Sequence, residues 1–212
     1  FAHKLYAYIT VDSWFACLSF FVDERVLIPP SPIAVLIQQQ FSPWIDSERV
    51  NNILDLCTGS GCIAVAAAMA FPDASVDATD IDPKALALAK ININEYEMED
   101  RIQLIGSDIY ENLSAIYDLI LSNPPYVPAG EIAHFPAEYH HEPAAAFDGG
   151  PAGLDLVHKI LQSASEFLAP DGHIVIEVGE SWTTLEQAYP KVAFNWLETG
   201  VEDSGLFIMD KT

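Results

Sequence analysis

Asn123, Pro124, Pro125 and Tyr126 are the residues whose types and spacing point most clearly to chemistry. They follow Tyr117–Ser122, an apolar run of strand length, which must end here because neither proline can donate a hydrogen bond to a sheet. Pro124 also favours an extended conformation at Asn123. Ligands bind at the carboxyl ends of the strands in an open α/β sheet, so the pattern predicts a stiff turn that presents an amide to a ligand. A rigid exit from the strand without any ligand is the structural alternative.

A second candidate site is the glycine-rich turn at residues 55–61, between a predicted strand and a predicted helix. Gly59 and Gly61 let the backbone approach a ligand closely, and the start of the helix offers free N–H groups. Asp80 ends the next predicted strand, where a carboxylate can accept hydrogen bonds from a ribose diol. Asp108 follows the third strand and is placed to meet an adenine ring. These positions predict a site for a nucleoside-containing ligand.

The spacing of this turn fits more than one ligand. Gly59-x-Gly61-x-x-Ala64, with an acidic residue about 20 positions further on, also satisfies the dinucleotide fingerprint. A glycine turn without a ligand is a third reading. Asp55 and Thr58 flank the glycines and suit the aminocarboxypropyl end of a sulfonium cofactor, which favours S-adenosylmethionine over NAD. A hairpin of the last two strands, expected in the methyltransferase version of this sheet, favours it too.

The elements that must position these residues alternate between strand and helix from Asn51 onward. We predict strands at residues 52–57, 74–81, 102–105, 117–122, 172–178, 192–197 and 206–210, and helices at 62–71, 83–96, 154–168 and 182–189. This alternation predicts an α/β fold with a doubly wound, mostly parallel sheet of seven strands. The last two strands have no helix between them, so they should form an antiparallel hairpin.

The N-terminal part has a different pattern, with scattered aromatic residues. We predict a strand over 14–21 and a hairpin over 20–28 that turns at Asp23 and Glu24. Ser31 fits a helix N-cap with Pro32 at the first helical position, and the helix should reach Gln40. We therefore expect two parts, an N-terminal segment over residues 1–46 on the substrate side and a cofactor-binding domain over residues 47–212.

The charge of the chain bears on its partners. Its formal net charge is −22, from 31 acidic and 9 basic residues, and the basic residues form no patch. Phosphate backbones attract clusters of Lys and Arg, so direct binding of nucleic acid is not expected. A basic protein partner is favoured by electrostatic steering. Solubility, or adaptation to a salty cytosol, accounts for the same charge equally well.

Cysteine and histidine patterns give no sign of a metal site. The three cysteines are an odd number without metal-ligand spacing, which suggests a reducing, cytoplasmic setting. His134, His140 and His141 also lack the usual spacings, and a substrate-gating loop is the favoured interpretation there. The longest apolar run, Cys62–Phe71, is too short to span a bilayer, so no membrane association is expected.

Three stretches together resemble the class I S-adenosylmethionine-dependent methyltransferases that modify glutamine side-chain amides: Asp55-Leu-x-Thr-Gly-Ser-Gly61, Ala78-Thr-Asp80 and Ser122-Asn-Pro-Pro-Tyr126. Residues 21–33 and 138–143 are similar to the PrmB branch, which methylates a glutamine in the third protein of the large ribosomal subunit. The sister branch acts on peptide-chain release factors. The resemblance implies a Rossmann-like fold, with residues 1–46 the remnant of a longer N-terminal domain. Pro30, Val35 and Ala152 depart from the branch pattern.

The resemblance also implies roles for the site residues. The side-chain oxygen of Asn123 and the carbonyl of Pro124 would accept hydrogen bonds from the substrate NH2 group, and Tyr126 would pack on the amide plane. Those three residues are the implied catalytic set. The implied cofactor-binding residues are Asp55, Cys57, Thr58, Gly59, Ser60, Gly61, Asp80, Ile81, Asp108, Ile109 and Asn123. The implied substrate-binding residues are Asn123, Pro124, Pro125, Tyr126, His141 and Glu142.

Four alternatives remain open on the sequence. A release factor is a second protein substrate that fits the same chemistry. An Asn-Pro-Pro-aromatic turn also serves enzymes that methylate exocyclic amines in RNA or DNA, because a planar NH2 group poses the same problem. A dehydrogenase would use the glycine turn for NAD, and a non-catalytic assembly module would bind the cofactor without turnover.

Overall fold

The computed structural model describes residues 6–28, 31–136, 139, 142–200 and 205–211. Its helices are α1 (Tyr6–Thr10), α2 (Ile33–Gln38), α3 (Cys62–Ala70), α4 (Pro83–Glu95), α5 (Ala129–Ile132), α6 (Asp155–Phe167) and α7 (Trp182–Ala188). Its strands are β1 (Asp12–Phe15), β2 (Leu18–Phe21), β3 (Asn52–Leu56), β4 (Ser75–Asp80), β5 (Ile102–Gly106), β6 (Tyr117–Ser122), β7 (Leu168–Glu177), β8 (Asn195–Trp196) and β9 (Leu206–Asp210). Short 3-10 turns lie at Ser47–Arg49, Ala144–Ala146 and Gly179–Ser181.

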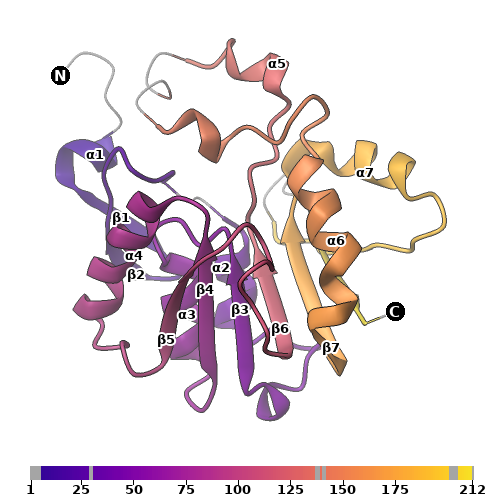
Figure 1. Ribbon diagram of the computed structural model, residues 1–212, viewed down its shortest axis with the longest axis horizontal. Coiled ribbons are helices and arrows are strands. Elements are labelled where there is room, and N and C mark those ends of the chain that lie inside the picture. Colours follow the sequence, from indigo (N-terminus) through magenta and orange to yellow (C-terminus); the bar gives the residue numbers. More distant parts are fainter. Residues whose placement is uncertain (1–5, 29–30, 137–138, 140–141, 201–204, 212) are drawn as a thin grey trace.

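Seven strands form the central sheet, in the order β5-β4-β3-β6-β7-β9-β8 (Figure 1). The pairs from β5 to β7 are all parallel, whereas β9 runs antiparallel to both β7 and β8. The predicted sheet with its C-terminal hairpin is therefore confirmed. Asp82 is the N-cap of α4 as predicted, and its carboxylate accepts a hydrogen bond from the Lys84 amide at 2.8 Å.

The N-terminal segment forms a hairpin, but the predicted position of its turn was wrong. The two strands are β1 and β2, and they turn at Ala16 and Cys17, whereas the predicted turn at Asp23 and Glu24 lies after β2. Ala16 and Cys17 both have positive φ, 49° and 65°, which suits a two-residue hairpin turn. Neither is Gly, Asn or Asp, so the sequence carries no turn signal at that place.

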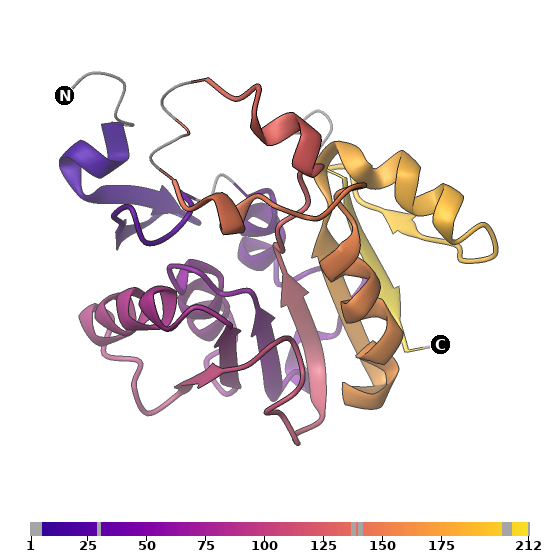
Figure 2. The same ribbon diagram turned by 45° about the horizontal axis from the view of Figure 1, so that its top comes forward.

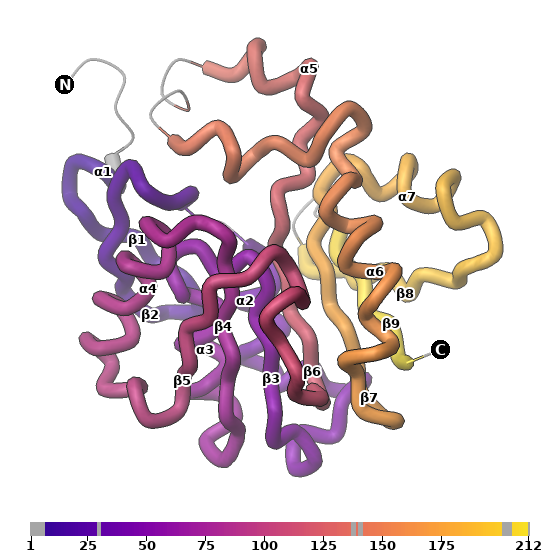
Figure 3. Tube along the Cα trace, in the orientation of Figure 1, coloured from indigo at the N-terminus to yellow at the C-terminus, as the bar shows by residue number. Residues whose placement is uncertain are grey.

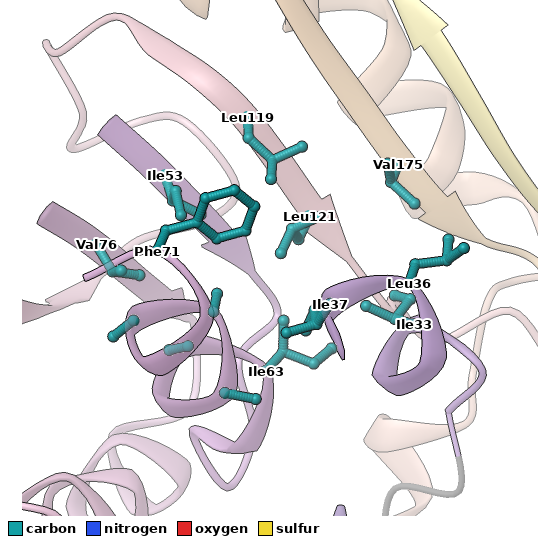
Figure 4. Packing of buried hydrophobic residues seen from close by; sticks show 14 of the residues in the cluster. Ile33, Leu36, Ile37, Ile53, Ile63, Phe71, Val76, Leu119, Leu121 and Val175 are labelled. Carbon is teal, nitrogen blue, oxygen red and sulfur yellow. The ribbon is translucent and has the colours of Figure 1, made fainter. Parts of the chain in front are cut away.

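Helices cover both faces of the sheet because side chains along each strand point alternately to opposite faces. On one face, α2 and α3 bury their apolar side chains against the strands, and Figure 4 shows Ile33, Leu36 and Ile37 of α2 near Leu121 and Val175. On the other face, α6 and α7 pack on the intervening residues of the same strands. Residues 33–46 thus contribute side chains to the apolar core of the main sheet.

The segment before α2 packs along α4, as the trace in Figure 3 shows. Tyr8, Val22 and Val26 form a small apolar cluster with α4, and the Tyr8 hydroxyl donates to the Val26 carbonyl at 2.5 Å. Asn92 of α4 is buried, and its side chain hydrogen-bonds both the amide and the carbonyl of Phe21 in β2. These contacts place residues 22–28 close to the carboxyl ends of β3 and β4.

None of the helices in the described residues is both long and apolar enough to cross a membrane.

Candidate active site

Two pockets lie at the carboxyl ends of the parallel strands, and Asn123 lines both of them. The segment that carries α5 lies over this edge of the sheet (Figure 2). Of the residues predicted from the sequence, the first pocket is lined by Cys57, Thr58, Gly59, Ser60, Asp80, Ile81, Asp108, Ile109, Asn123 and Pro125. The second is lined by Asn123, Pro124, Tyr126 and Glu142, together with Leu27, Ile28, Val127, Phe135, Pro136, Tyr139, Ala146 and Phe147. Asn123 therefore stands between a pocket made by the glycine turn and a pocket made by the loop that follows β6.

Asp80 holds the glycine turn in place. Its two carboxylate oxygens accept hydrogen bonds from the amides of Gly59, at 3.0 Å, and Asp82, at 2.9 Å. A carboxylate has about four acceptor positions, so both oxygens can still accept from a ligand in the pocket. Burial raises the pKa of Asp80 above its ordinary value, and the amide donors oppose this shift.

Gly61 is the residue of the turn that sterics most clearly require. Its φ is +79°, and a Cβ there would lie 3.1 Å from the Cβ of Ala89 in α4. The turn therefore brings α3 close to α4, and any side chain would be strained both in its backbone and in its contacts. Gly61 supports the first pocket from behind but does not line it.

Asp55 lies beneath the glycine turn and is fully buried, so the structure does not bring it to the wall of the first pocket. Its Oδ2 accepts hydrogen bonds from Thr58 Oγ1 at 2.5 Å and from the Ala64 amide at 3.1 Å. Within the part of the chain that the structure describes, its Oδ1 has no hydrogen-bond partner. Burial raises the pKa of Asp55 to about 7, against the opposing effect of the two donors.

We expect the free energy of unfolding of the ligand-free protein to fall as pH rises from about 4.5 to 7.5. Burial raises the pKa of Asp55, Glu142 and Glu177 alike to about 7. An acid whose folded pKa exceeds its unfolded pKa binds its proton more tightly when folded. Its contribution to stability is complete below the unfolded pKa and is lost as pH rises through the folded one. Urea unfolding at several pH values measures this slope.

The variant Asp55→Asn isolates one of these three groups. An asparagine oxygen can accept from both Thr58 and Ala64, but the side chain does not titrate. We expect the free energy of unfolding of the variant to fall less steeply with pH than that of the wild type. The slope that remains would come from Glu142, Glu177 and general charge repulsion. A slope equal to that of the wild type would show that Asp55 does not titrate in this range.

The far side of the first pocket combines apolar and acidic side chains. Ile81 is 71% exposed, and both it and Ile109 line the pocket, where they offer apolar surface to a planar ring. Asp108 also lines it and lies 3.6 Å from the ammonium group of Lys159 in α6. Arg25, Val26 and Leu27 of the N-terminal segment complete the wall.

The turn after β6 leaves two acceptors without partners among the described residues. The structure gives no hydrogen bond to the side chain of Asn123 or to the carbonyl of Pro124 within that part of the chain. Tyr126, in contrast, is held firmly: its hydroxyl donates to Glu177 Oε1 at 2.9 Å, and its carbonyl accepts from Ser181 Oγ at 3.1 Å. Burial raises the pKa of the Tyr126 phenol, so the hydroxyl stays protonated and remains a donor.

The loop after the turn supplies the apolar wall of the second pocket. Phe135, Tyr139 and Phe147 form a cluster with ring centroids 5.1 to 6.3 Å apart. Glu142 is 7% exposed, and its Oε2 has no hydrogen-bond partner among the described residues. Burial raises the pKa of this acid to about 7, while the Ile28 amide and the Tyr8 hydroxyl oppose the shift.

Two of the remaining sequence predictions concern histidines. His141 lies outside the described residues, as does its neighbour His140. His134 is exposed, and its Nδ1 lies 3.1 Å from the Gly130 carbonyl. No group of side chains that could hold a metal ion occurs among the described residues.

Sequence reasoning missed three residues that support the site. Glu177 contacts Tyr126, Ser31 contacts Glu177, and Asn92 donates to the Ser60 carbonyl at 2.8 Å. Glu177 had a usable signal, because an acid at the end of a predicted parallel strand lies at the ligand-binding edge. Asn92 had no such signal, because it lies inside α4 and the apolar periodicity that predicts this helix does not depend on it.

The chain is similar to known proteins both in sequence and in fold. The model of the methyltransferase small domain family matches residues 38–138. The chain is 47% identical over 206 residues to the ribosomal protein uL3 glutamine methyltransferase of Neisseria gonorrhoeae, covering 97% of this chain and 69% of that protein.

Solved structures resemble the fold at lower identity. The 16S rRNA methyltransferase RsmC of T. thermophilus, in complex with AdoMet and guanosine, has a TM-score of 0.61 at 17% identity, covering 95% of this chain and 50% of that one. The ribosomal protein L11 methylase of Lactobacillus delbrueckii subsp. bulgaricus has a TM-score of 0.57 at 19% identity, covering 84% and 77%. These likenesses support a Rossmann-like methyltransferase fold.

Proposed function

The chain belongs to the family of ribosomal protein uL3 glutamine methyltransferases, and on that premise we propose that it methylates a glutamine side chain of uL3. It is an S-adenosylmethionine-dependent enzyme that transfers a methyl group to an amide nitrogen of a protein. The observation that carries the proposal is the position of Asn123, which lines both pockets. Leu27 and Ala146 also line both pockets, but Asn123 is the one of these three residues with a polar side chain, so it can hold a reacting amide where the two ligands meet.

The first pocket is the proposed site for S-adenosylmethionine, which supplies an electrophilic methyl group on a sulfonium sulfur. Its residues fit that molecule: Asp80 retains acceptor capacity for the ribose diol, and Ile81 and Ile109 offer apolar surface to the adenine ring. The backbone of the glycine turn lies open beside them, with Gly59 at φ +54°. Asp55 does not contact the cofactor in this proposal. It supports the pocket by hydrogen bonds that hold Thr58 and the first turn of α3 in place.

The second pocket is the proposed site for the glutamine side chain. An amide nitrogen is a weak nucleophile because its lone pair is delocalised into the carbonyl. The Asn123 side-chain oxygen and the Pro124 carbonyl would each accept a hydrogen bond from one N–H of the substrate. These bonds would hold the nitrogen in place and stabilise the positive charge that develops on it as its bond to the methyl group forms and the bond from methyl to sulfur breaks. Proximity and orientation alone can lower such a barrier by about 7–11 kcal/mol. No strong base is needed if the proton leaves after transfer.

The N-terminal segment is proposed to act on the substrate side. Leu27 lines both pockets, and Ile28 lines the second, so this segment borders the path of an entering side chain. The formal net charge of −22 supports a basic surface on the protein partner and disfavours direct contact with nucleic acid. A ribosomal protein substrate is consistent with action in the cytoplasm, which we propose as the setting.

Glu142 lines the second pocket, and it is proposed to bind the substrate there. At alkaline pH, where an acid with a pKa of about 7 is ionised, we expect Glu142→Gln to raise the KM for uL3 by about 10-fold or more, because a hydrogen bond to a charged group contributes roughly 1.5–3 kcal/mol. The affinity for S-adenosylmethionine should not change. Steady-state kinetics with each substrate varied in turn measures both, and Glu131→Gln, an exposed acid on α5, is the matched control. An unchanged KM for uL3 would remove Glu142 from the substrate site.

The proposed function is tested with purified uL3 and S-adenosylmethionine. Peptide mapping by mass spectrometry should find one added methyl group on a glutamine side chain. Methylation only at lysine or arginine would contradict the proposed chemistry, because those nitrogens do not require two amide acceptors.

A further inference from the structure

Glu177 is a buried acid at the end of β7, 3% exposed, and it contacts neither pocket. The parallel register pairs Ile176 with Ser122, so Glu177 lies level with Asn123 at the edge of the sheet. Its carboxylate accepts two hydroxyl hydrogen bonds, from Tyr126 to Oε1 at 2.9 Å and from Ser31 to Oε2 at 2.5 Å. One side chain therefore joins three segments: the end of β7, the turn after β6 and the start of α2.

We propose that Glu177 is a positioning residue for methyl transfer, which fixes Tyr126 and through it the acceptors of Asn123 and Pro124. The inference rests on the proposed role of that turn. A buried carboxylate is costly to desolvate and adds little net stability, even when it is paired. Its presence here is explained better by the geometry that it imposes than by the stability that it adds.

The rest of the surroundings show why the phenol hydroxyl matters. The Tyr126 carbonyl is bonded to Ser181, and a Cβ on Gly179 would lie 2.5 Å from the Tyr126 ring. A Cβ on Gly153 would lie 2.3 Å from the Tyr126 carbonyl. The backbone and one edge of the ring are thus closely confined. The hydrogen bond to Glu177 fixes the outer end of the ring, and it sets the direction in which the ring faces the second pocket.

Ser31 extends the same link to the N-terminal segment. Its hydroxyl donates to Glu177 and also accepts from the Ile33 amide at 3.3 Å, in the first turn of α2. Glu177 therefore sets the spacing between α2 and the turn after β6. The wall made by Leu27 and Ile28 precedes Ser31 in the chain and borders the same pocket.

We expect Glu177→Ala to lower kcat for methylation of uL3 by about 10- to 100-fold, because small displacements of a positioned reactant have effects of that size. The dissociation constant for S-adenosylmethionine should stay within about twofold of the wild type. Glu177→Gln should recover part of the loss, since its amide oxygen can still accept from Tyr126. Glu180→Gln, an exposed acid on the next turn, is the control for lost charge.

A double-mutant cycle separates positioning from general damage to the fold. Tyr126→Phe removes the donor of the same hydrogen bond, so Glu177→Ala combined with Tyr126→Phe should lose no more than Glu177→Ala alone. Additive losses, or a kcat for Glu177→Ala equal to that of the wild type, would overturn the inference. If Glu177→Ala does not fold, Glu177→Gln and Tyr126→Phe make the same comparison. Full activity of Asn123→Ala would instead overturn the proposed function, and this inference with it.

Discussion

Asn123→Ala is expected to lower methyl transfer to uL3 by about 100-fold or more while leaving the affinity for S-adenosylmethionine almost unchanged. The variant removes one of the two acceptors that orient the amide, and the loss of a preorganised polar group of this kind costs about 100- to 1,000-fold in kcat. The backbone should keep its course, because Pro124 and Pro125 still define the turn and Tyr126 keeps its bonds to Glu177 and Ser181. Single-turnover kinetics measures the transfer step, and calorimetry measures cofactor binding.

Asn195→Ala is the matched control, since Asn195 is exposed in β8 and lies away from both pockets. It should behave as the wild type in both measurements. Undiminished turnover by Asn123→Ala would show that the turn after β6 does not carry the chemistry.

Asp80→Ala is expected to weaken the binding of S-adenosylmethionine by roughly 1.5–3 kcal/mol, the range for hydrogen bonds to a charged group. The loss has two physical sources. The ribose diol would lose its acceptor, and the amides of Gly59 and Asp82 would lose the carboxylate that holds the glycine turn in place. Saturating cofactor should restore much of the turnover, because the acceptors for the amide are intact.

The control for Asp80 is Asp73→Ala, an exposed acid before the opposite end of the same strand. Isothermal titration calorimetry on both variants compares them under the same salt and pH. Equal affinities in Asp80→Ala and the wild type would remove Asp80 from the cofactor site.

Most of the sheet could be predicted from the sequence because its strands are buried apolar runs with clear boundaries. β6 spans Tyr117–Ser122 as predicted, and Pro124 and Pro125 explain its end. The start of α4 at Pro83 was also predicted, since Asp82 and Pro83 form a recognisable N-terminal pair. The helix expected from Pro32 to Gln40 was predicted less well. It spans Ile33–Gln38, and its N-cap is Pro32 rather than Ser31, although the Ser31 hydroxyl still accepts a hydrogen bond from the Ile33 amide.

The failures have a common physical cause, which is that the decisive contacts join residues distant in the sequence. The hairpin turn at Ala16 and Cys17 is built from residues with no turn preference, so its position depends on how β1 and β2 pack on the rest of the protein. The bond from Ser31 to Glu177 spans 146 positions, and no local pattern indicates it. α5 is a single short turn of Ala129–Ile132, below the length at which periodicity is informative.

Some residues of the candidate site could be predicted from the sequence, and others depend on contacts between distant parts of the chain. Residues that line the pockets at the ends of strands could be placed from the topology alone, because parallel strands bring their carboxyl ends to one edge. Asp55 was predicted to bind the cofactor, but it lies in β3, buried beneath the glycine turn and away from the pocket wall. Its burial follows from the packing of α3, which could not be inferred from spacing.

The most direct measurement is a parallel assay of methyl transfer from labelled S-adenosylmethionine to three purified acceptors: uL3, a peptide-chain release factor and ribosomal RNA. We predict label in uL3, located on a glutamine side chain, and none in the RNA. Label in the RNA alone would contradict the central claim, and label in the release factor alone would keep the chemistry but refute the proposed substrate.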